Sequence, residues 1–179
     1  DPRGRALRRR AAPCHNPRMP VTVTAPRGLN CLAPTLRALI VQVLRGEGRR
    51  VGEIAVVLSD DSLLRQINHD WRGIDRATDV LSFAHDEREP DADTRPVRGD
   101  LLVSLDRVHD QARRYRVPPG AELARLVVHG ALHLCGHDHA RANERQRMRT
   151  REQSALKTAR SLVHTLALAL ESSPARTRA

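Results

Sequence analysis

Four of the nine histidines of this chain fall within eleven residues, in the stretch VVHGALHLCGHDHA at 127–140. His129 and His133 are four residues apart, a spacing that on a helix puts both rings on one face, one turn apart. Gly136 then permits a sharp turn that can bring His139 back as a third nitrogen ligand. Three neutral imidazoles around one zinc ion leave the fourth position to water, which is typical of catalytic rather than structural sites.

The other side chains of this stretch leave alternatives open. His137 could replace His139 as the third ligand, although the spacing favours His139. Asp138 could orient a ligand imidazole or cap the turn, and Cys135 is predicted to be a packed thiol, because as a fourth ligand it would close the site. Zinc is the ion expected from the ligand type, while nickel, copper and iron also bind imidazole.

The residue after the first histidine of the cluster bears on the reaction. The spacing H-x-x-x-H-x-x-G-x-x-H also occurs in metzincin proteases, which carry a general-base glutamate after the first histidine. Gly130 stands there in this chain and cannot transfer a proton. Cleavage of a phosphodiester, which depends chiefly on positioning and on stabilising negative charge, is therefore favoured over peptide hydrolysis. A zinc hydrolase acting on peptides or amides stays the first alternative.

At these residues the chain resembles the YbeY family of bacterial metallo-endoribonucleases, whose signature is similar to H-G-x-L-H-L-x-G-[YH]-D-H. A second block, similar to N-x-x-x-R-x-x-D-x-x-T-D-V-L-S-F, runs from Asn68 through Arg72 to Phe83, with Ala77 where the family usually has proline. A third, G-D-[IL]-x-[IV]-S, is present at 99–104. The blocks follow the family's order, and the resemblance covers roughly residues 19–160.

The resemblance implies a zinc-dependent endoribonuclease specific for single-stranded RNA. Its expected partners are the 16S rRNA precursor and the ribosome, in 16S rRNA 3′-end maturation and late quality control of 70S ribosomes. It implies zinc on His129, His133 and His139. The second alternative is a ribosome-assembly factor without catalysis, in which the metal only braces the fold.

The resemblance also places Arg72 in the catalytic groove. A planar guanidinium can hold two phosphate oxygens and stabilise the charge that develops on them in the transition state. Asp79 and Asp100 are weaker candidates, because either carboxylate could equally cap a turn or anchor a loop.

The elements that must position these side chains alternate along the chain. Short aliphatic runs predict four strands, at residues 21–25, 54–58, 79–83 and 100–104. Apolar residues at helical spacing predict helices at residues 34–46, 60–67, 104–115, 120–134 and 142–171. This order predicts an α+β (α/β-like) fold in a single domain, with a small mixed four-stranded sheet packed with about five helices. The zinc site would lie on helix 120–134 and the following turn.

Residues at the predicted helix ends support these boundaries. Pro34 suits a first helical turn, and Gly46 is expected to end that helix. Ser59 or Asp60 can cap the second helix, and Ser104 can cap the third.

Length and charge suggest how the chain is divided. The 179 residues suit one domain. Residues 1–18 are predicted to be a disordered basic extension, with Met19 as the natural start. Residues 19–160 would form the metallo-endoribonuclease domain, and 161–179 a helical extension and disordered tail. The two ends carry +7 of the net charge of +10, so the high isoelectric point is weak support for a nucleic-acid partner.

Composition limits the expected cellular compartment and the kind of side chain that can form the core. Three cysteines show no disulfide framework, and there is no apolar run of about 18 residues, so the protein is predicted to be cytoplasmic and without a membrane partner. Trp71, Phe83 and Tyr115 are the only large aromatic residues, so the core must be aliphatic. Few rings are then left for nucleobases to stack on, and charge is expected to dominate any contact with nucleic acid.

Overall fold

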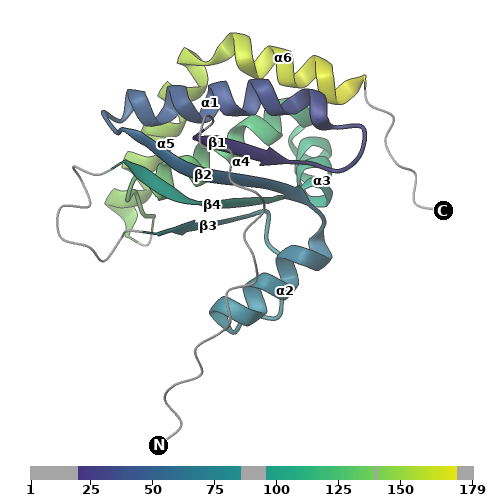
Figure 1. Cartoon of the computed structure of the whole chain (residues 1–179), viewed down its shortest axis with the longest axis horizontal. Helices are drawn as coiled ribbons and strands as arrows, with labels where there is room; N and C mark the ends of the chain where they lie inside the picture. Colours follow the sequence, from purple (N-terminus) through teal and green to yellow (C-terminus); the bar gives the residue numbers. More distant parts are fainter. Residues whose placement is uncertain (1–19, 86–95, 140, 173–179) are drawn as a thin grey trace, which may run out of the picture.

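Four strands form one mixed sheet in the order β1-β2-β4-β3 (Figure 1). The computed structural model describes residues 20–85, 96–139 and 141–172. Its strands are β1 (Val21–Thr24), β2 (Val51–Ser59), β3 (Val80–Ala84) and β4 (Val97–Ser104). β2 runs parallel to both β1 and β4, and β3 pairs antiparallel with β4 at the edge. The predicted small mixed sheet is confirmed.

The helices lie in unequal numbers on the two faces of this sheet (Figure 1). On one face, α1 (Ala33–Gly46), preceded by the short 3₁₀ helix η1 (Asn30–Leu32), packs beside α4 (Pro119–Leu134), with α6 (Arg160–Glu171) lying over both. α3 (Leu105–Tyr115) and α5 (Ala142–Thr158) also pack against α4, and α2 (Asp61–Arg72) packs against the other face. α4 is therefore the central helix of the fold.

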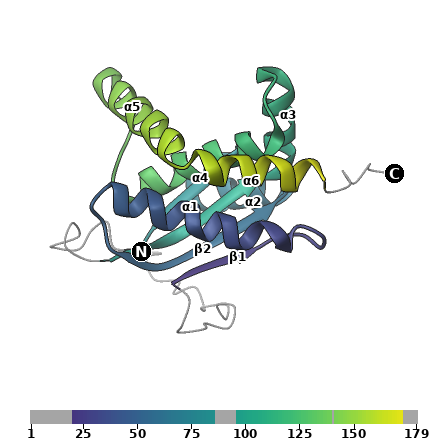
Figure 2. The ribbon, with the colours of Figure 1, turned by 90° about the horizontal axis from the view of Figure 1, so that it is seen from above.

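The predicted helix at 142–171 is wrong in one respect, because it is two helices. The backbone leaves helical geometry at Ala159 (φ −91°, ψ 18°), and the side chain of this residue is buried. The break lets α6 turn back over α1 and α4, and Figure 2 shows α5 and α6 running in different directions. Periodicity could not reveal the break, because the apolar spacing continues through it.

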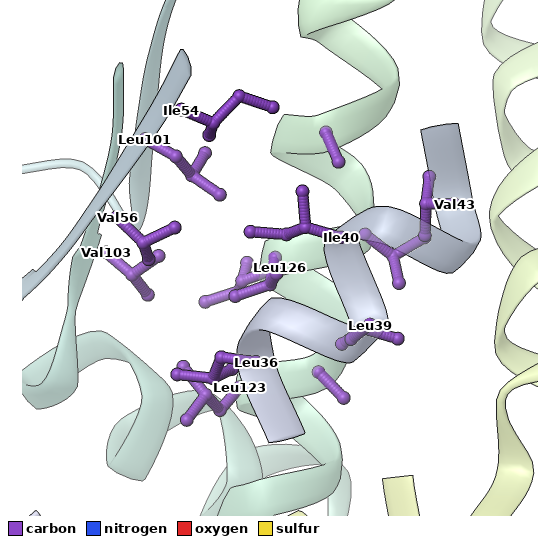
Figure 3. Packing of buried hydrophobic residues seen from close by; sticks show 14 of the residues in the cluster. Leu36, Leu39, Ile40, Val43, Ile54, Val56, Leu101, Val103, Leu123 and Leu126 are labelled. Carbon is purple, nitrogen blue, oxygen red and sulfur yellow. The ribbon is translucent and has the colours of Figure 1, made fainter. Parts of the chain in front are cut away.

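The core is aliphatic, as the shortage of aromatic residues predicted. Side chains from α1, α4, β2 and β4 interdigitate in the space between helices and sheet (Figure 3). They include Leu36, Leu39, Ile40, Val43, Ile54, Val56, Leu101, Val103, Leu123 and Leu126. A smaller cluster of Leu64, Leu81 and Leu102 attaches α2 to the opposite face.

Two predicted caps are confirmed at helix starts. The Asp60 carboxylate accepts a hydrogen bond from the Leu63 backbone N–H at 3.0 Å, and the Ser104 hydroxyl accepts one from Arg107 N–H at 3.2 Å. Because Ser104 ends β4 and caps α3, which begins at Leu105, the chain passes from strand to helix without a loop.

Two predictions fall partly or wholly outside the described residues. The basic extension at 1–18 lies outside them, as do residues 173–179 of the tail, while residues 161–171 belong to α6. Leu166 and Leu170 of α6 are buried in the main core. In the described ranges, no helix combines the length and the apolar character needed to cross a bilayer.

A tight contact between α4 and α6 yields a stability prediction. A Cβ at Gly120 would overlap the carbonyl group of Leu166, a backbone group that cannot rotate away. Gly120→Ala is therefore expected to lower the free energy of unfolding by about 1–3 kcal/mol, measured by urea denaturation. Gly46→Ala is the control, because a Cβ there meets nothing within 4 Å. Equal loss of stability in both variants would contradict this packing.

Candidate metal centre

Three imidazoles converge at the carboxyl end of α4. His129 and His133 come from the helix and His139 from the chain that follows it. Their ring centroids are 4.9, 5.0 and 5.5 Å apart, and one nitrogen of each ring lies within 4.8 Å of the others. Within the described part of the chain, these three side chains form the cluster suited to hold a metal ion. The triad expected from the spacing is therefore assembled in space.

The turn after α4 brings the third histidine back. Gly136 adopts a left-handed backbone (φ 89°), which favours glycine. Its N–H donates to the His133 carbonyl at 2.9 Å, and the His137 N–H donates to the Leu132 carbonyl at 3.1 Å, closing the helix end. Asp138 then accepts a hydrogen bond from the His139 N–H at 2.6 Å. Of the two roles left open for Asp138, the structure shows the turn-stabilising one.

His137 is engaged elsewhere. Its Nε2 donates a hydrogen bond to the Glu47 carboxylate at 2.7 Å, and that carboxylate also lies 3.4 Å from the guanidinium of Arg151. Arg49 adds a hydrogen bond to the Cys135 carbonyl at 3.4 Å. These contacts attach the turn to the end of α1, and they leave His139 as the histidine that completes the triad.

A carboxylate behind the triad selects the nitrogen that His129 presents. The Nδ1 of His129 lies 3.0 Å from the Glu152 carboxylate, on α5. An ionised carboxylate can only accept, so Nδ1 carries the proton and Nε2 keeps its lone pair for a metal. Sequence analysis missed Glu152. The available signal was its position four residues after buried Met148, on the apolar face of the predicted helix.

Glu152 is held in turn by a polar network along α4. Its carboxylate lies 3.8 Å from the guanidinium of Arg125, which grips the buried carboxylate of Glu122 in a fork with contacts of 2.6–3.1 Å. These hydrogen bonds raise the pKa of Arg125. Because Arg125 stays charged, the Glu152 carboxylate has a fixed positive group beside it.

Burial adjusts the protonation of two side chains here. It lowers the pKa of His133 to about 4, aided by the neighbouring charges of His129 and His139 and opposed by a hydrogen bond to the His137 backbone. The His133 ring is thus neutral at pH 7, as metal binding requires. Burial raises the pKa of the Cys135 thiol to about 11. Cys135 packs against the core as a protonated thiol, which confirms the prediction.

Gly130 lies between the triad and the sheet. A Cβ there would overlap the Leu101 side chain and come within 3.2 Å of Val80. Position 130 therefore faces the sheet, with no room for the general base of a metzincin. The sequence argument against peptide hydrolysis has a steric basis in the fold.

Arg72 does not join the triad. It is the last residue of α2, on the other face of the sheet, and its exposed guanidinium has no hydrogen bond or ion pair to any described residue. Asp79 serves as an anchor, accepting hydrogen bonds from Val80 N–H at 2.9 Å and from the Gln111 amide at 3.0 Å. Asp100 accepts one from His85 at 2.9 Å.

Comparison with known proteins identifies the family. Residues 30–160 match the model of the family described as Endoribonuclease YbeY. The chain belongs to the YbeY endoribonuclease family. Members of this family are hydrolases that act on RNA, so the predicted enzyme class is confirmed.

Individual YbeY relatives cover most of the chain. A protein named Endoribonuclease YbeY from Anaeromyxobacter sp. (strain Fw109-5) is 41% identical over 151 residues, which are 84% of this chain and 75% of the relative. One of the same name from Pelotomaculum thermopropionicum is 38% identical over 145 residues, which are 77% of this chain and 95% of the relative. The resemblance that the three sequence blocks indicated is confirmed.

A solved structure shows the same fold. It is the solution structure of TM1509 from Thermotoga maritima, with a TM-score of 0.52, covering 88% of this chain and 99% of that one. At 24% identity this likeness concerns the fold alone. The α+β architecture predicted for the YbeY-like domain is thus confirmed.

The two histidines of the turn can be told apart by metal content. His139→Ala is expected to lose the bound metal, because it removes a nitrogen of the triad. The matched variant His137→Ala is expected to retain it, because that ring is bonded to Glu47. The measurement is elemental analysis after dialysis. If His137→Ala lost the metal and His139→Ala kept it, His137 would be the third ligand instead of His139.

The carboxylate behind His129 gives a second prediction for this site. Glu152→Ala is expected to weaken Zn²⁺ affinity about 10- to 100-fold in a chelator competition, because Nδ1 loses its acceptor. Glu152→Gln should lose less, since its amide oxygen still accepts. Gln153→Ala, the exposed neighbour on α5, is the control. Wild-type affinity in Glu152→Ala would show that the contact does not position the ring.

Proposed function

We propose that this chain is a zinc-dependent endoribonuclease specific for single-stranded RNA. Its substrate would be the 16S rRNA precursor, cleaved during 3′-end maturation in the cytoplasm, with a further role in late quality control of 70S ribosomes. The observation that carries the proposal is the convergence of three imidazoles in a member of the YbeY endoribonuclease family.

The residues of the cluster suit zinc. They offer three nitrogen donors, with one ring held neutral by burial and another oriented by Glu152. His129, His133 and His139 would hold the ion. When bound, zinc supplies Lewis acidity, which polarises a phosphate oxygen or lowers the pKa of a water molecule to about 7.

Arg72 is proposed to bind the scissile phosphate. Its guanidinium forms no hydrogen bond or ion pair within the described residues, so its charge and its five donors are free for an anion. Held by two parallel hydrogen bonds, the phosphate would be oriented, and charge developing on its oxygens would be stabilised. Gly130 packs on the sheet, so position 130 offers no group that could accept a proton from the nucleophile.

Arg72→Ala is expected to lower the rate of RNA cleavage about 100- to 1,000-fold, the usual loss when one donor to transition-state charge is removed. Arg72→Lys should recover only part of it, since an ammonium lacks the planar fork. The assay follows a labelled single-stranded RNA with purified protein of measured zinc content. Arg160→Ala, an exposed arginine at the start of α6, is the control.

His133→Ala separates catalysis from a bracing role of the metal. If Arg72→Ala and His133→Ala both stay folded and still complete 16S rRNA processing in cells, the catalytic proposal fails. The remaining alternative is then a ribosome-assembly factor without catalysis. Mapping of the product ends identifies the nucleophile, because a 2′,3′-cyclic phosphate forms only when the 2′-hydroxyl of the RNA attacks.

A further inference from the structure

The largest apolar ring of the chain is not used by the core. Trp71, at the end of α2, leaves 73% of its surface exposed, although the described core buries aliphatic side chains almost completely. Its ring touches Phe83 of β3, with centroids 5.6 Å apart and the planes inclined by 49°. An indole buried in a core removes about 150–250 Å² from water, and this fold forgoes most of that stabilisation.

Two positively charged side chains follow this ring in the sequence. Arg72 follows Trp71 directly, and Arg76 lies in the loop after α2. Neither guanidinium has a hydrogen bond or ion pair to a described residue. The nearby carboxylates are partly occupied, since Asp75 binds Arg65 and Asp70 lies 3.4 Å from His69. An exposed aromatic ring beside free arginines is the combination that binds single-stranded nucleic acid.

The loop that carries Arg76 is held against α2. The Arg65 guanidinium grips the Asp75 carboxylate with two contacts, of 2.6 and 2.8 Å, and these hydrogen bonds lower the pKa of Asp75. The buried Asn68 donates to the Arg76 carbonyl at 2.7 Å, and Gly73, in left-handed geometry, ends the helix. The ring and the two arginines therefore belong to one preorganised segment, which reduces the entropy lost on binding.

The position of β3 connects this segment to the histidines. β3 is the edge strand; Phe83 meets Trp71 on the α2 face, and Val80 lies beside Gly130 of α4 on the other. Figure 1 shows β3 lying between α2 and the remaining helices. A strand of RNA that passes over this edge would reach from α2 toward the carboxyl end of α4.

We propose that Trp71 stacks on an unpaired base of the RNA substrate beside the scissile phosphate that Arg72 binds, while Arg76 contacts a neighbouring phosphate. This proposal rests on the endoribonuclease function proposed above, and it adds a residue that binds substrate. It also supplies a physical source of single-strand selectivity, because a base inside a duplex has both faces covered by its neighbours. Charge is still expected to dominate the contact with nucleic acid, and stacking on Trp71 would add an aromatic contact where two of the three aromatic rings meet.

The chain contains its own reporter, because Trp71 is its only tryptophan. Mixing the full-length protein with a single-stranded RNA decamer in a stopped-flow instrument is expected to quench tryptophan fluorescence before cleavage begins. The same sequence annealed into a duplex should leave the fluorescence unchanged. Absence of a quench with single-stranded RNA would overturn the stacking.

Variants test the same contact through affinity. Trp71→Ala is expected to weaken binding of labelled single-stranded RNA about tenfold and to raise KM with little change in kcat, whereas Trp71→Phe retains most of the affinity. Tyr115→Ala is the matched control, because Tyr115 is also exposed (57%) but lies on α3. Circular dichroism before each assay identifies variants that fail to fold. If Trp71→Ala is one of them, the fluorescence quench of the wild-type protein tests the stacking instead.

The outcomes separate this proposal from the one on which it rests. If Trp71→Ala binds and cleaves RNA as the wild type does, stacking is overturned and the endoribonuclease proposal stands. If the wild-type protein neither binds nor cleaves RNA, both proposals fall. If Trp71→Ala binds naked RNA normally and loses only its association with purified ribosomes, the indole contacts a protein, and base stacking is again overturned.

Discussion

The burial of α4 is the constraint on which the rest of this structure depends. This helix contacts the sheet, α1, α3, α5 and α6, and most of its surface is apolar and closed to water. Its rotation about its own axis is fixed by that packing. Gly130 must face Leu101 and Val80, and this same rotation brings His129 and His133 onto the face where His139 returns. Core packing thereby positions the histidines of the triad.

The polar contacts around the triad join segments that are far apart in the chain. Glu152 comes from α5 and orients His129, while Glu47 comes from the end of α1 and holds the turn through His137. Both carboxylates are more than four-fifths buried, so their charges are only weakly screened by solvent. Binding of an ion would therefore stabilise the arrangement of three helices, and not only the turn that carries His139.

The two faces of the sheet carry different parts of the proposed site. The imidazoles lie on the side of α4, with a half-buried, low-pKa histidine among them, whereas Arg72 and Trp71 lie on the side of α2 and are exposed to solvent. This separation follows from the chemistry of each group. A neutral imidazole tolerates burial, while an unpaired guanidinium loses its hydration at high cost and stays at the surface until a phosphate replaces the water.

Sequence alone determined what depends on local geometry. The spacing of His129 and His133 on a helix, the left-handed turn at Gly136 and the caps at Asp60 and Ser104 all follow from residues a few positions apart. The aliphatic core followed from composition, since only three large aromatic rings were available.

Only the tertiary structure decided the choices that depend on distant residues. It separated His139 from His137, because Glu47 lies ninety positions before His137. It revealed Glu152 behind His129, and it broke the last predicted helix at Ala159, where α6 turns back over α4. In each case the local sequence pattern allows either outcome, and a contact with a residue far away in the chain selects one of them.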